Sequence, residues 1–302
     1  MSTDIFALTR GDVRFPTALA AIHDPPQTLW IKGDAGVLRV PAVAIVGSRA
    51  ASPYALEVAR RLGSDLARRN VAVVSGMARG VDSAAHRGAL EADGITVAVF
   101  GCGVDVIYPP EHRELAKRIA ERGALVSEFP PGMPPLKNNF PQRNRIISGL
   151  SLAVVIVEAA DGSGSLITAD FALEQGRAVL AVPGNVLGGR NYGAHALLRD
   201  GAKLVECADD ILEELPASLT QAGLRAEGLG LTEGKGSKGL SSASQDPVLR
   251  SMVDGDAYDL DEIAERSGLD RMRLLPRLLE LELAGAVRRV DGGRFVRFLG
   301  PC

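Results

Sequence analysis

The sequence predicts an α/β fold built on a Rossmann-like, doubly wound and mostly parallel sheet, followed by a small C-terminal winged-helix domain. Short apolar runs alternate with helix-length amphipathic segments from about residue 42 to residue 215. The apolar runs lack polar alternation, so we expect both faces of their sheet to be buried. Repeated strand–helix–strand units of this kind are typical of a parallel sheet with helices on both faces.

The elements follow in order along the chain. Residues 1–41 contain PTALAAIHDPPQTLWIKGD, which predicts a short helix, a proline turn and one added strand that pack on the core. The predicted Rossmann-like domain covers residues 42–215, and Ser52 and Pro53 fit the N-cap and first position of its first helix. Its strands are AVAIVGS, VAVVSG, TVAVFG, GALVSE, LAVVIVEA and AVLAVPG, and its helices are expected over 53–69, 80–92, 111–122, 164–176 and 193–200.

Beyond residue 215 the composition changes. Residues 216–245 are rich in Gly, Ser and Lys, which predicts a flexible linker. Residues 246–302 contain three helical segments, with Asp259 and Asp270 at N-cap positions and Gly268 and Gly285 at helix ends. The run AVRRVDGGRFVRF then reads as a hairpin with Asp-Gly as its turn. Three helices followed by a hairpin predict a winged helix.

Composition excludes several classes of protein. The chain has 302 residues, a net charge of −3, 46% hydrophobic and 24% charged residues, so it can bury a substantial core. The apolar runs are too short to span a bilayer, and the N-terminus shows no secretion signal. Cys102, Cys207 and Cys302 are too scattered for a metal cluster or a disulfide framework, which fits a reducing cytoplasm. With a pI of about 5.9, any site for a polyanion must be local.

Glycine-rich loops follow four of the predicted strands. They are Gly47-Ser48-Arg49, residues 75–80, residues 101–103 and residues 161–168. The carboxyl ends of parallel strands share one edge, where ligands bind. Glycine permits close backbone approach, free N–H groups at helix N-termini attract anions, and Arg49 and Arg79 add positive charge. Any one loop is explained equally well as a tight turn, but the four loops and two arginines together favour an anion-binding edge.

Other chemistry receives less support from the sequence. No loop reads G-x-G-x-x-G and no acidic residue ends the second strand, so no dinucleotide cofactor is expected. Asp82 and His86 share a helix face without a third metal ligand, which favours capping or packing. Glu158 and Asp161 fit paired carboxylates for acid–base chemistry, or equally a strand-end Glu that bonds backbone amides. We therefore predict no catalytic residue, no metal and no cofactor.

The segment KNNFPQRNRIISGLS, residues 137–151, is basic and contains no acid. It precedes the fifth strand and so reaches the same edge of the sheet. Because proline disfavours helix for its predecessor, we expect a helical turn or two from Arg143, with Arg143, Asn144 and Arg145 projecting from its start. Basic side chains for phosphates, Phe140 for base stacking and Asn for base edges suit single-stranded nucleic acid. A solvated basic loop with Phe140 buried in the core is an equal alternative.

Seven motifs occur in order along the chain: GSR at 47–49, SGMARGVDSAAH at 75–86, GCGVDVIYP at 101–109, SEFP at 127–130, FPQRNRIISGLS at 140–151, SGSLITA at 163–169 and AVPG at 181–184. In these motifs the chain resembles the DNA-processing protein A (DprA/Smf) family over roughly residues 12–207. The tail resembles the winged-helix domain that many members carry. The helical N-terminal domain of some members is expected to be absent or reduced.

The resemblance implies a cytoplasmic bacterial protein that binds and protects single-stranded DNA, forms a homodimer, and loads RecA onto incoming DNA during natural transformation, without catalysis. The helices near 164–176 and 193–215 are candidates for the dimer surface. Carried over by position, the resemblance implies a DNA groove formed by Arg49, Lys137, Phe140, Arg143, Asn144 and Arg145, with Gly47, Ser48, Ser163 and Gly164 on the same rim. Arg79 and Asn139 complete the set of twelve predicted DNA-contacting residues.

Two alternatives stay open. The related nucleotide phosphoribohydrolases of the lysine-decarboxylase-like group carry a P-G-G-x-G-T-x-x-E loop, but Thr168 stands here in place of the catalytic Glu, which lowers the enzyme hypothesis. A winged helix is usually a reader of duplex DNA. Residues 246–302, however, hold nine Arg and eleven Asp or Glu, a net charge of −2, which favours contact with protein or weak contact with duplex over specific readout.

Overall fold

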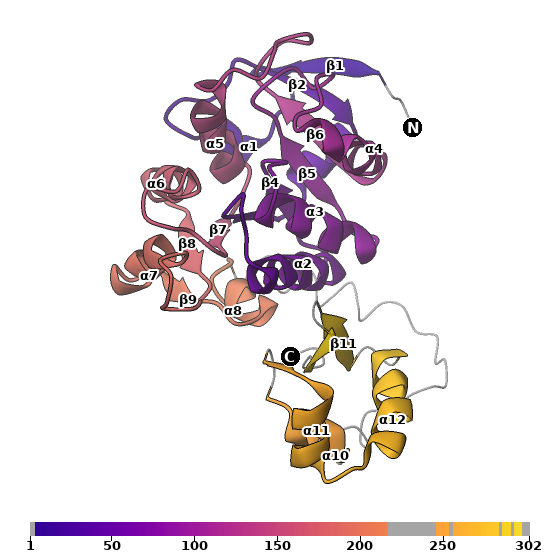
Figure 1. The fold of residues 1–302 in the computed structure, drawn as a ribbon. Coiled ribbons are helices and arrows are strands. Elements are labelled where there is room, and N and C mark those ends of the chain that lie inside the picture. Colours follow the sequence, from indigo (N-terminus) through magenta and orange to yellow (C-terminus); the bar gives the residue numbers. More distant parts are fainter. Residues whose placement is uncertain (1–3, 217–245, 254–255, 284–285, 291–292, 298–302) are drawn as a thin grey trace. The chain divides into compact units, whose positions relative to one another are not determined.

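The computed structural model describes residues 4–216, 246–253, 256–283, 286–290 and 293–297. The chain forms two compact units, residues 1–229 and 230–302 (Figure 1). The linker predicted at 216–245 lies outside the described residues except for Pro216.

The first unit is built on a nine-stranded sheet in the order β1-β2-β6-β5-β4-β3-β7-β8-β9 (Figure 1). In that order, each strand from β6 through β5, β4, β3, β7 and β8 to β9 is parallel to its neighbour. At one edge, β1 pairs antiparallel with β2, and β2 pairs antiparallel with β6. The mostly parallel, doubly wound sheet is therefore confirmed. The strands are β1 (Ile5–Thr9), β2 (Thr28–Gly33), β3 (Ala42–Val46), β4 (Ala72–Ser75), β5 (Thr96–Val99), β6 (Ala124–Ser127), β7 (Ala153–Ile156), β8 (Ala178–Ala181) and β9 (Lys203–Leu204).

The N-terminal extension contributes two strands to this sheet, where the sequence predicted one. The added strand β2 was expected, but β1 was not. Its run IFAL is apolar, but it stands among polar residues near the N-terminus, outside the strand–helix alternation by which the other strands were recognised, and only Leu8 is fully buried.

Helices cover both faces of the sheet. Val43, Val73 and Val155 face one core with α2 and α3, while Ala44, Val74 and Ile156 face another with α5 and α6. Among the described residues, none of the helices combines the length and apolar character needed to cross a membrane. The helices are α1 (Thr17–Ala20), η1 (Ala35–Arg39), α2 (Pro53–Arg68), α3 (Val81–Glu91), η2 (Pro110–His112), α4 (Arg113–Arg122), α5 (Asn139–Gly149), α6 (Leu166–Glu174), α7 (Tyr192–Arg199) and α8 (Ala208–Leu212).

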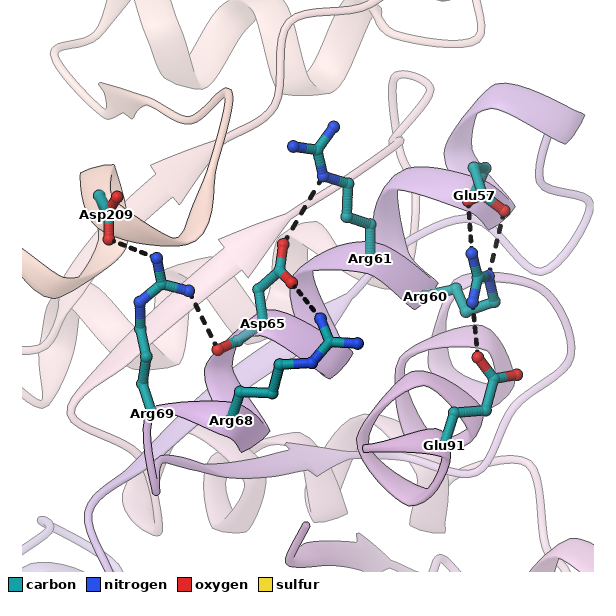
Figure 2. Close-up of polar contacts among 8 residues, drawn as sticks. All are labelled: Glu57, Arg60, Arg61, Asp65, Arg68, Arg69, Glu91 and Asp209. Carbon is teal, nitrogen blue, oxygen red and sulfur yellow. Dashed lines mark hydrogen bonds and ion pairs between the residues drawn. The ribbon is translucent and has the colours of Figure 1, made fainter. Parts of the chain in front are cut away.

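Helix α2 carries a row of arginines that ties it to its neighbours (Figure 2). Arg60 pairs with Glu91 of α3, and Arg69 pairs with Asp209 of α8 at 2.8 Å. Arg61 and Arg68 flank Asp65 of the same helix. Because each of these arginines has an acidic partner, the row joins helices and offers no free cationic surface. Pairs this exposed stabilise a fold by about 0–1 kcal/mol each.

Helix α3 buries His86, in agreement with the predicted packing role. Its Nδ1 lies 2.7 Å from Oγ1 of Thr96, and that hydroxyl donates its own proton to the carbonyl of Val73. Nδ1 of His86 must therefore carry the imidazole proton. Burial, reinforced by the nearby charge of Arg143, lowers the pKa of His86 from 6.5 to about 3.

We expect this histidine to make the first unit sensitive to acid. Below about pH 6.5 His86 binds a proton in the unfolded chain, whereas in the folded protein it stays neutral down to about pH 3. The free energy of unfolding therefore falls as the pH drops from about 6.5 to about 3. Between about pH 7 and pH 5 wild type should lose about 2 kcal/mol more than His86→Leu. Urea unfolding followed by Trp30, the only tryptophan of the chain, measures this difference. Equal losses in the two proteins would contradict it.

The second unit is a winged helix. Asp259 forms a capping box with Glu262, Asp270 accepts the N–H of Arg273, and Gly268 ends its helix with φ of 70°. The three predicted helices and the hairpin strands are confirmed, while Gly285 and the Asp-Gly turn lie outside the described residues. The elements are α10 (Pro247–Ser251), β10 (Ala257–Tyr258), α11 (Leu260–Ser267), α12 (Arg271–Leu283), β11 (Val287–Val290) and β12 (Arg294–Arg297).

Candidate nucleic-acid interface

A pocket of about 410 Å³ opens at the carboxyl ends of β3 and β7. These strands are neighbours, but β3 leads into α2 on one face of the sheet and β7 leads into α6 on the other. This is the topological switch point at which open α/β sheets bind ligands. The walls are Val46 at the end of β3 and residues 47–49 after it, residues 160–165 after β7, the first turn of α6, and part of α5, with Ala78 and Asp82 on a third side.

Two glycines, Gly47 in the loop after β3 and Gly80 in the loop after β4, stand where neighbouring atoms leave no room for a side chain. A Cβ on Gly47 would lie 2.8 Å from Val81 and 2.9 Å from the carbonyl of Glu158. Gly80 has φ of 75°, and a Cβ there would lie 2.2 Å from the carbonyl of Ser48. The two glycines therefore let the backbones of the loops after β3, β4 and β7 approach one another at the pocket. This agrees with the close backbone approach that the sequence predicted at this edge of the sheet.

Glu158 serves the backbone at this edge. It is buried, and its carboxylate accepts both the N–H of Ser52 and the hydroxyl of Ser52, the latter at 2.6 Å. Ser52 in turn accepts the N–H of Ala55 and caps α2. Of the two interpretations of Glu158 in the sequence, the structure supports the one in which it bonds backbone amides.

Arg49 and Phe140 form one side of the pocket. Arg49 is exposed, and within the described ranges it has no ion pair. Its guanidinium carbon lies 5.8 Å from the centre of the half-buried Phe140 ring. Tyr108, which is 44% exposed, places its own ring centre 5.5 Å from that of Phe140. Phe140 is therefore an accessible wall of the pocket, flanked by a cation and a second aromatic ring.

Arg143 forms the floor of the same pocket. It is 4% exposed, and Nη1 donates to the carbonyls of Gly76, at 2.7 Å, and Val99. No carboxylate of the described residues pairs with it. The charge of Asp82 acts on Arg143, but the Asp82 carboxylate accepts the N–H groups of Gly76 and Ala78. Burial lowers the pKa of Arg143 to about 10, so the pocket has a cationic floor at neutral pH.

The loop after β7 supplies the remaining polar groups. Ser163 and Ser165 share a hydrogen bond of 2.8 Å between their hydroxyls, and Nδ2 of Asn144 donates to the carbonyl of Gly164 at 3.2 Å. Helix α6 begins at Leu166, and its first turn lines the pocket. The N-terminal end of a helix carries partial positive charge, which attracts anions.

The prediction that Arg143, Asn144 and Arg145 project from a helix start is wrong. Helix α5 begins at Asn139 with Pro141 in its first turn, where proline is tolerated, so the three residues fall on its second, buried turn. Arg143 and Asn144 still line the pocket. Arg145 does not.

Arg145 lies inside the protein. It is 6% exposed, its two terminal nitrogens bond both oxygens of Glu128 at 2.7 Å, and Nε bonds Asp24 at 2.9 Å. These contacts join α5 to the end of β6 and to the N-terminal extension. Its charge is compensated there, which argues against the predicted role in contacting DNA.

The structure thus divides the twelve predicted residues into two groups. Arg79 is paired with Glu111, Lys137 is exposed, and Asn139 is buried. These three residues and Arg145 do not line it. The residues that do are Gly47, Ser48, Arg49, Phe140, Arg143, Asn144, Ser163 and Gly164.

Some residues of the site were not predicted. Tyr108 ends the motif GCGVDVIYP just before Pro109. An aromatic residue in a loop at this edge of the sheet is the signal that could have identified it. Asp82 accepts two N–H groups of the loop after β4, and its charge opposes that of Arg143. In the sequence, its i, i+4 spacing to His86 was considered only as a possible pair of metal ligands or as capping and packing. Ser165, Thr168 and the exposed Asp161 also line the pocket.

The third helix of the second unit, α12, has a different surface character. Arg271 pairs with Asp261, and Arg277 pairs with Asp246 at 2.6 Å and with Glu280. Its exposed apolar side chains are Met272, Leu275 and Leu279. This helix therefore presents apolar side chains and compensated arginines rather than a free cationic face.

Comparison with known proteins identifies the family. The family model of DNA recombination-mediator protein A matches residues 6–216, and that of the DprA winged helix domain matches residues 237–293. Protein Smf of Escherichia coli is 43% identical over 294 residues, which cover 95% of this chain and 76% of that protein. DNA processing protein DprA of Streptococcus pneumoniae is 44% identical over 66% of this chain and 71% of its own length.

Two solved structures share the fold. The crystal structure of DprA from Streptococcus pneumoniae has a TM-score of 0.68 and 42% identity, and covers 70% of this chain and 75% of its own. A structure from Helicobacter pylori, described as giving insight into the single-stranded DNA binding mode of its DNA processing protein A, has a TM-score of 0.63 and 30% identity over 70% of this chain and 97% of its own. With its glycine-lined pocket at the switch point and its winged helix, the chain belongs to the DNA recombination-mediator protein A (DprA/Smf) family.

Proposed function

We propose that this protein binds single-stranded DNA in the pocket at the ends of β3 and β7. The observation that carries the proposal is the juxtaposition of two arginines with an accessible aromatic ring. Arg49 and the buried Arg143 offer donors to a phosphate, and both guanidinium groups lie within about 6 Å of the Phe140 ring. Cationic grooves with aromatic platforms are how proteins hold single strands without reading sequence.

The likeness to the Helicobacter pylori protein supports this choice of ligand, because single-stranded DNA is what that protein is described as binding. From the family we further propose that the protein protects incoming DNA in the cytoplasm, loads a RecA recombinase onto it, and acts as a homodimer in natural transformation. The description of the family as recombination mediators supports the loading step.

Binding to DNA is tested on the full chain by fluorescence anisotropy with a labelled oligothymidylate. We expect tight binding that weakens as salt rises, with a slope of about −0.7 for each phosphate contacted. Unlabelled single strands should compete, whereas duplex of equal length should compete poorly. Equal competition by duplex, or the absence of binding, would overturn the proposal.

The hydrolase alternative has less support in the geometry. Thr168 lines the pocket where the related enzymes carry a catalytic Glu, and Glu158 is engaged with Ser52. Asp82 already accepts two backbone N–H groups. Of the described residues that line the pocket, this leaves Asp161 as the carboxylate open to solvent. Release of base from a nucleoside monophosphate, lost in Asp161→Asn, would favour the enzyme instead.

We propose that the winged helix contacts protein rather than reading duplex DNA. Its third helix exposes Met272, Leu275 and Leu279 while its arginines are paired with acids of the same unit. Apolar residues at this spacing lie on one helix face, which suits contact with another protein surface.

A further inference from the structure

The loop that follows β8, residues 183–191 (the β8 loop), lies beside the loops after β3 and β7 that form the pocket. Nη1 of Arg190 donates to the carbonyl of Ala50 at 2.8 Å, one residue beyond Arg49. The N–H of Gly193 donates to the carbonyl of Ala159 at 2.9 Å, next to the pocket wall at Ala160. Since β8 is the neighbour of β7, this loop lies at the same edge of the sheet as the two loops that form the pocket.

The loop has a defined shape with anchored ends. The hydroxyl of Tyr54 donates to the carbonyl of Pro183 at 2.9 Å, and Asn191, which is buried, lies beneath Gly184, where a Cβ would fall 2.1 Å from Nδ2 of its amide. Gly189 has φ of 74°, a left-handed conformation that glycine adopts without strain. The part of the loop near the pocket is thus fixed by contacts with α2 and α7.

This anchored loop presents a cation and an aromatic ring to solvent. Arg190 is exposed and has no acidic partner among the described residues. Tyr192, which follows the loop, is 53% exposed, and its ring edge rests against Gly189, where a Cβ would lie 3.6 Å from Cε2. A ring supported on a glycine turn is held in place without being covered, so it can accept a stacked base.

We propose that the β8 loop is a second contact region for single-stranded DNA, in which Arg190 binds a phosphate and Tyr192 stacks on a base of the strand that leaves the pocket. This rests on the proposed function, and it extends the site beyond the residues that line the pocket. A pocket of about 410 Å³ is at the small end of the range for sites that enclose a ligand, so a longer strand must continue outside it. Tyr108, Phe140 and Tyr192 then combine three aromatic rings with the cations Arg49 and Arg190 along one edge. Grooves that hold single strands combine these two kinds of group.

The test compares oligothymidylates of about 4 and about 16 nucleotides bound to the full chain, by anisotropy. Tyr192→Ala and Arg190→Ala should each weaken binding of the longer strand, by about 5- to 150-fold for Tyr192→Ala, and leave binding of the shorter strand within about 2-fold of wild type. Tyr192→Phe keeps the stacking surface and should bind like wild type. Arg118→Ala is the matched control, because Arg118 is an exposed arginine of α4 without an ion pair among the described residues.

The outcomes separate this inference from the function on which it rests. If wild type binds neither oligonucleotide, the proposed function fails. If wild type binds both, Arg49→Glu loses both, and the β8 loop variants match wild type at both lengths, then only the second contact region is wrong. Size-exclusion chromatography gives a further check, because a change of oligomeric state in Tyr192→Ala, with unchanged affinity per chain, would assign the ring to a contact between subunits and overturn the inference.

Discussion

Arg49→Glu is expected to weaken binding of single-stranded DNA by about 100-fold or more at low salt, while the thermal unfolding temperature stays within a few degrees of wild type. A hydrogen bond to a charged group contributes about 1.5–3 kcal/mol, and the introduced carboxylate adds repulsion from phosphate. Arg49 is exposed and bears no described ion pair, so its reversal leaves no buried acid behind. Anisotropy titration at two salt concentrations measures the loss and the accompanying decrease in the salt slope.

Arg118→Glu makes the same change of charge on α4, away from the pocket, and is the matched control. It should reduce affinity by only a few-fold, through the net charge alone. If the two variants lost affinity equally, the attraction would be a property of the whole surface and the pocket would have no special part in it.

Arg145→Ala is expected to lower the free energy of unfolding of the first unit by about 3–5 kcal/mol, because it leaves the largely buried carboxylate of Glu128 without its cation. The side chains of Arg145 and Glu128 are 7% and 12% exposed, so solvent cannot replace the lost partner. Urea unfolding followed by Trp30 reports this region directly, since Trp30 pairs with Ser127 next to Glu128.

Two variants complete this experiment. Arg122→Ala removes an exposed ion pair with Asp93 and should cost no more than about 1 kcal/mol. The double variant Arg145→Met, Glu128→Met replaces the buried pair with apolar groups and should recover most of the stability lost by Arg145→Ala. If Arg145→Ala unfolded at the wild-type urea concentration but failed to bind DNA, the sequence-based prediction that Arg145 contacts DNA would be correct.

The sheet was predictable because burial on both faces leaves a simple pattern. Runs such as AVAIV and AVVI have no polar residue, and Ser52 and Pro53 mark a helix start by their own chemistry. The edge strand β1 escaped prediction because its short run IFAL stands among polar residues, outside the strand–helix alternation that begins near residue 42. Strand β9, which pairs with β8, has two residues and is too short to show a pattern.

The position of the site in the fold could be predicted from the sequence more reliably than the individual residues that line it. The rule that ligands bind where parallel strands end located Arg49 and the loop after β7 correctly beside one pocket. The basic segment was harder, because the start of α5 decides which arginines face the pocket. A shift of the helix start from Arg143 to Asn139 turned Arg145 toward Glu128, and a carboxylate 17 residues away cannot be identified as its partner from spacing.

Arg143 shows that the pattern of charges along a sequence does not reveal whether a cation is exposed or buried. From the sequence it was a surface cation, whereas in the structure it is a buried one held by the carbonyls of Gly76 and Val99. A Cβ on Gly76 would lie 2.6 Å from its Nη2, so the glycine of the loop after β4 makes room for the guanidinium. That loop was predicted to bind anions through its own backbone, and it supports the arginine that forms the floor of the pocket.

Photo-cross-linking most directly tests the central claim, which is that single-stranded DNA lies in the pocket at the carboxyl ends of β3 and β7. The full chain is irradiated with an oligothymidylate that carries 4-thiothymidine, and the attached peptides are identified by mass spectrometry. The proposed site predicts cross-links on the peptide that contains Phe140 and on those of residues 46–49 and 160–168, all lost on competition with unlabelled single strand. Cross-links confined to the winged helix, or spread over α2 and α4 without any at the pocket, would contradict it.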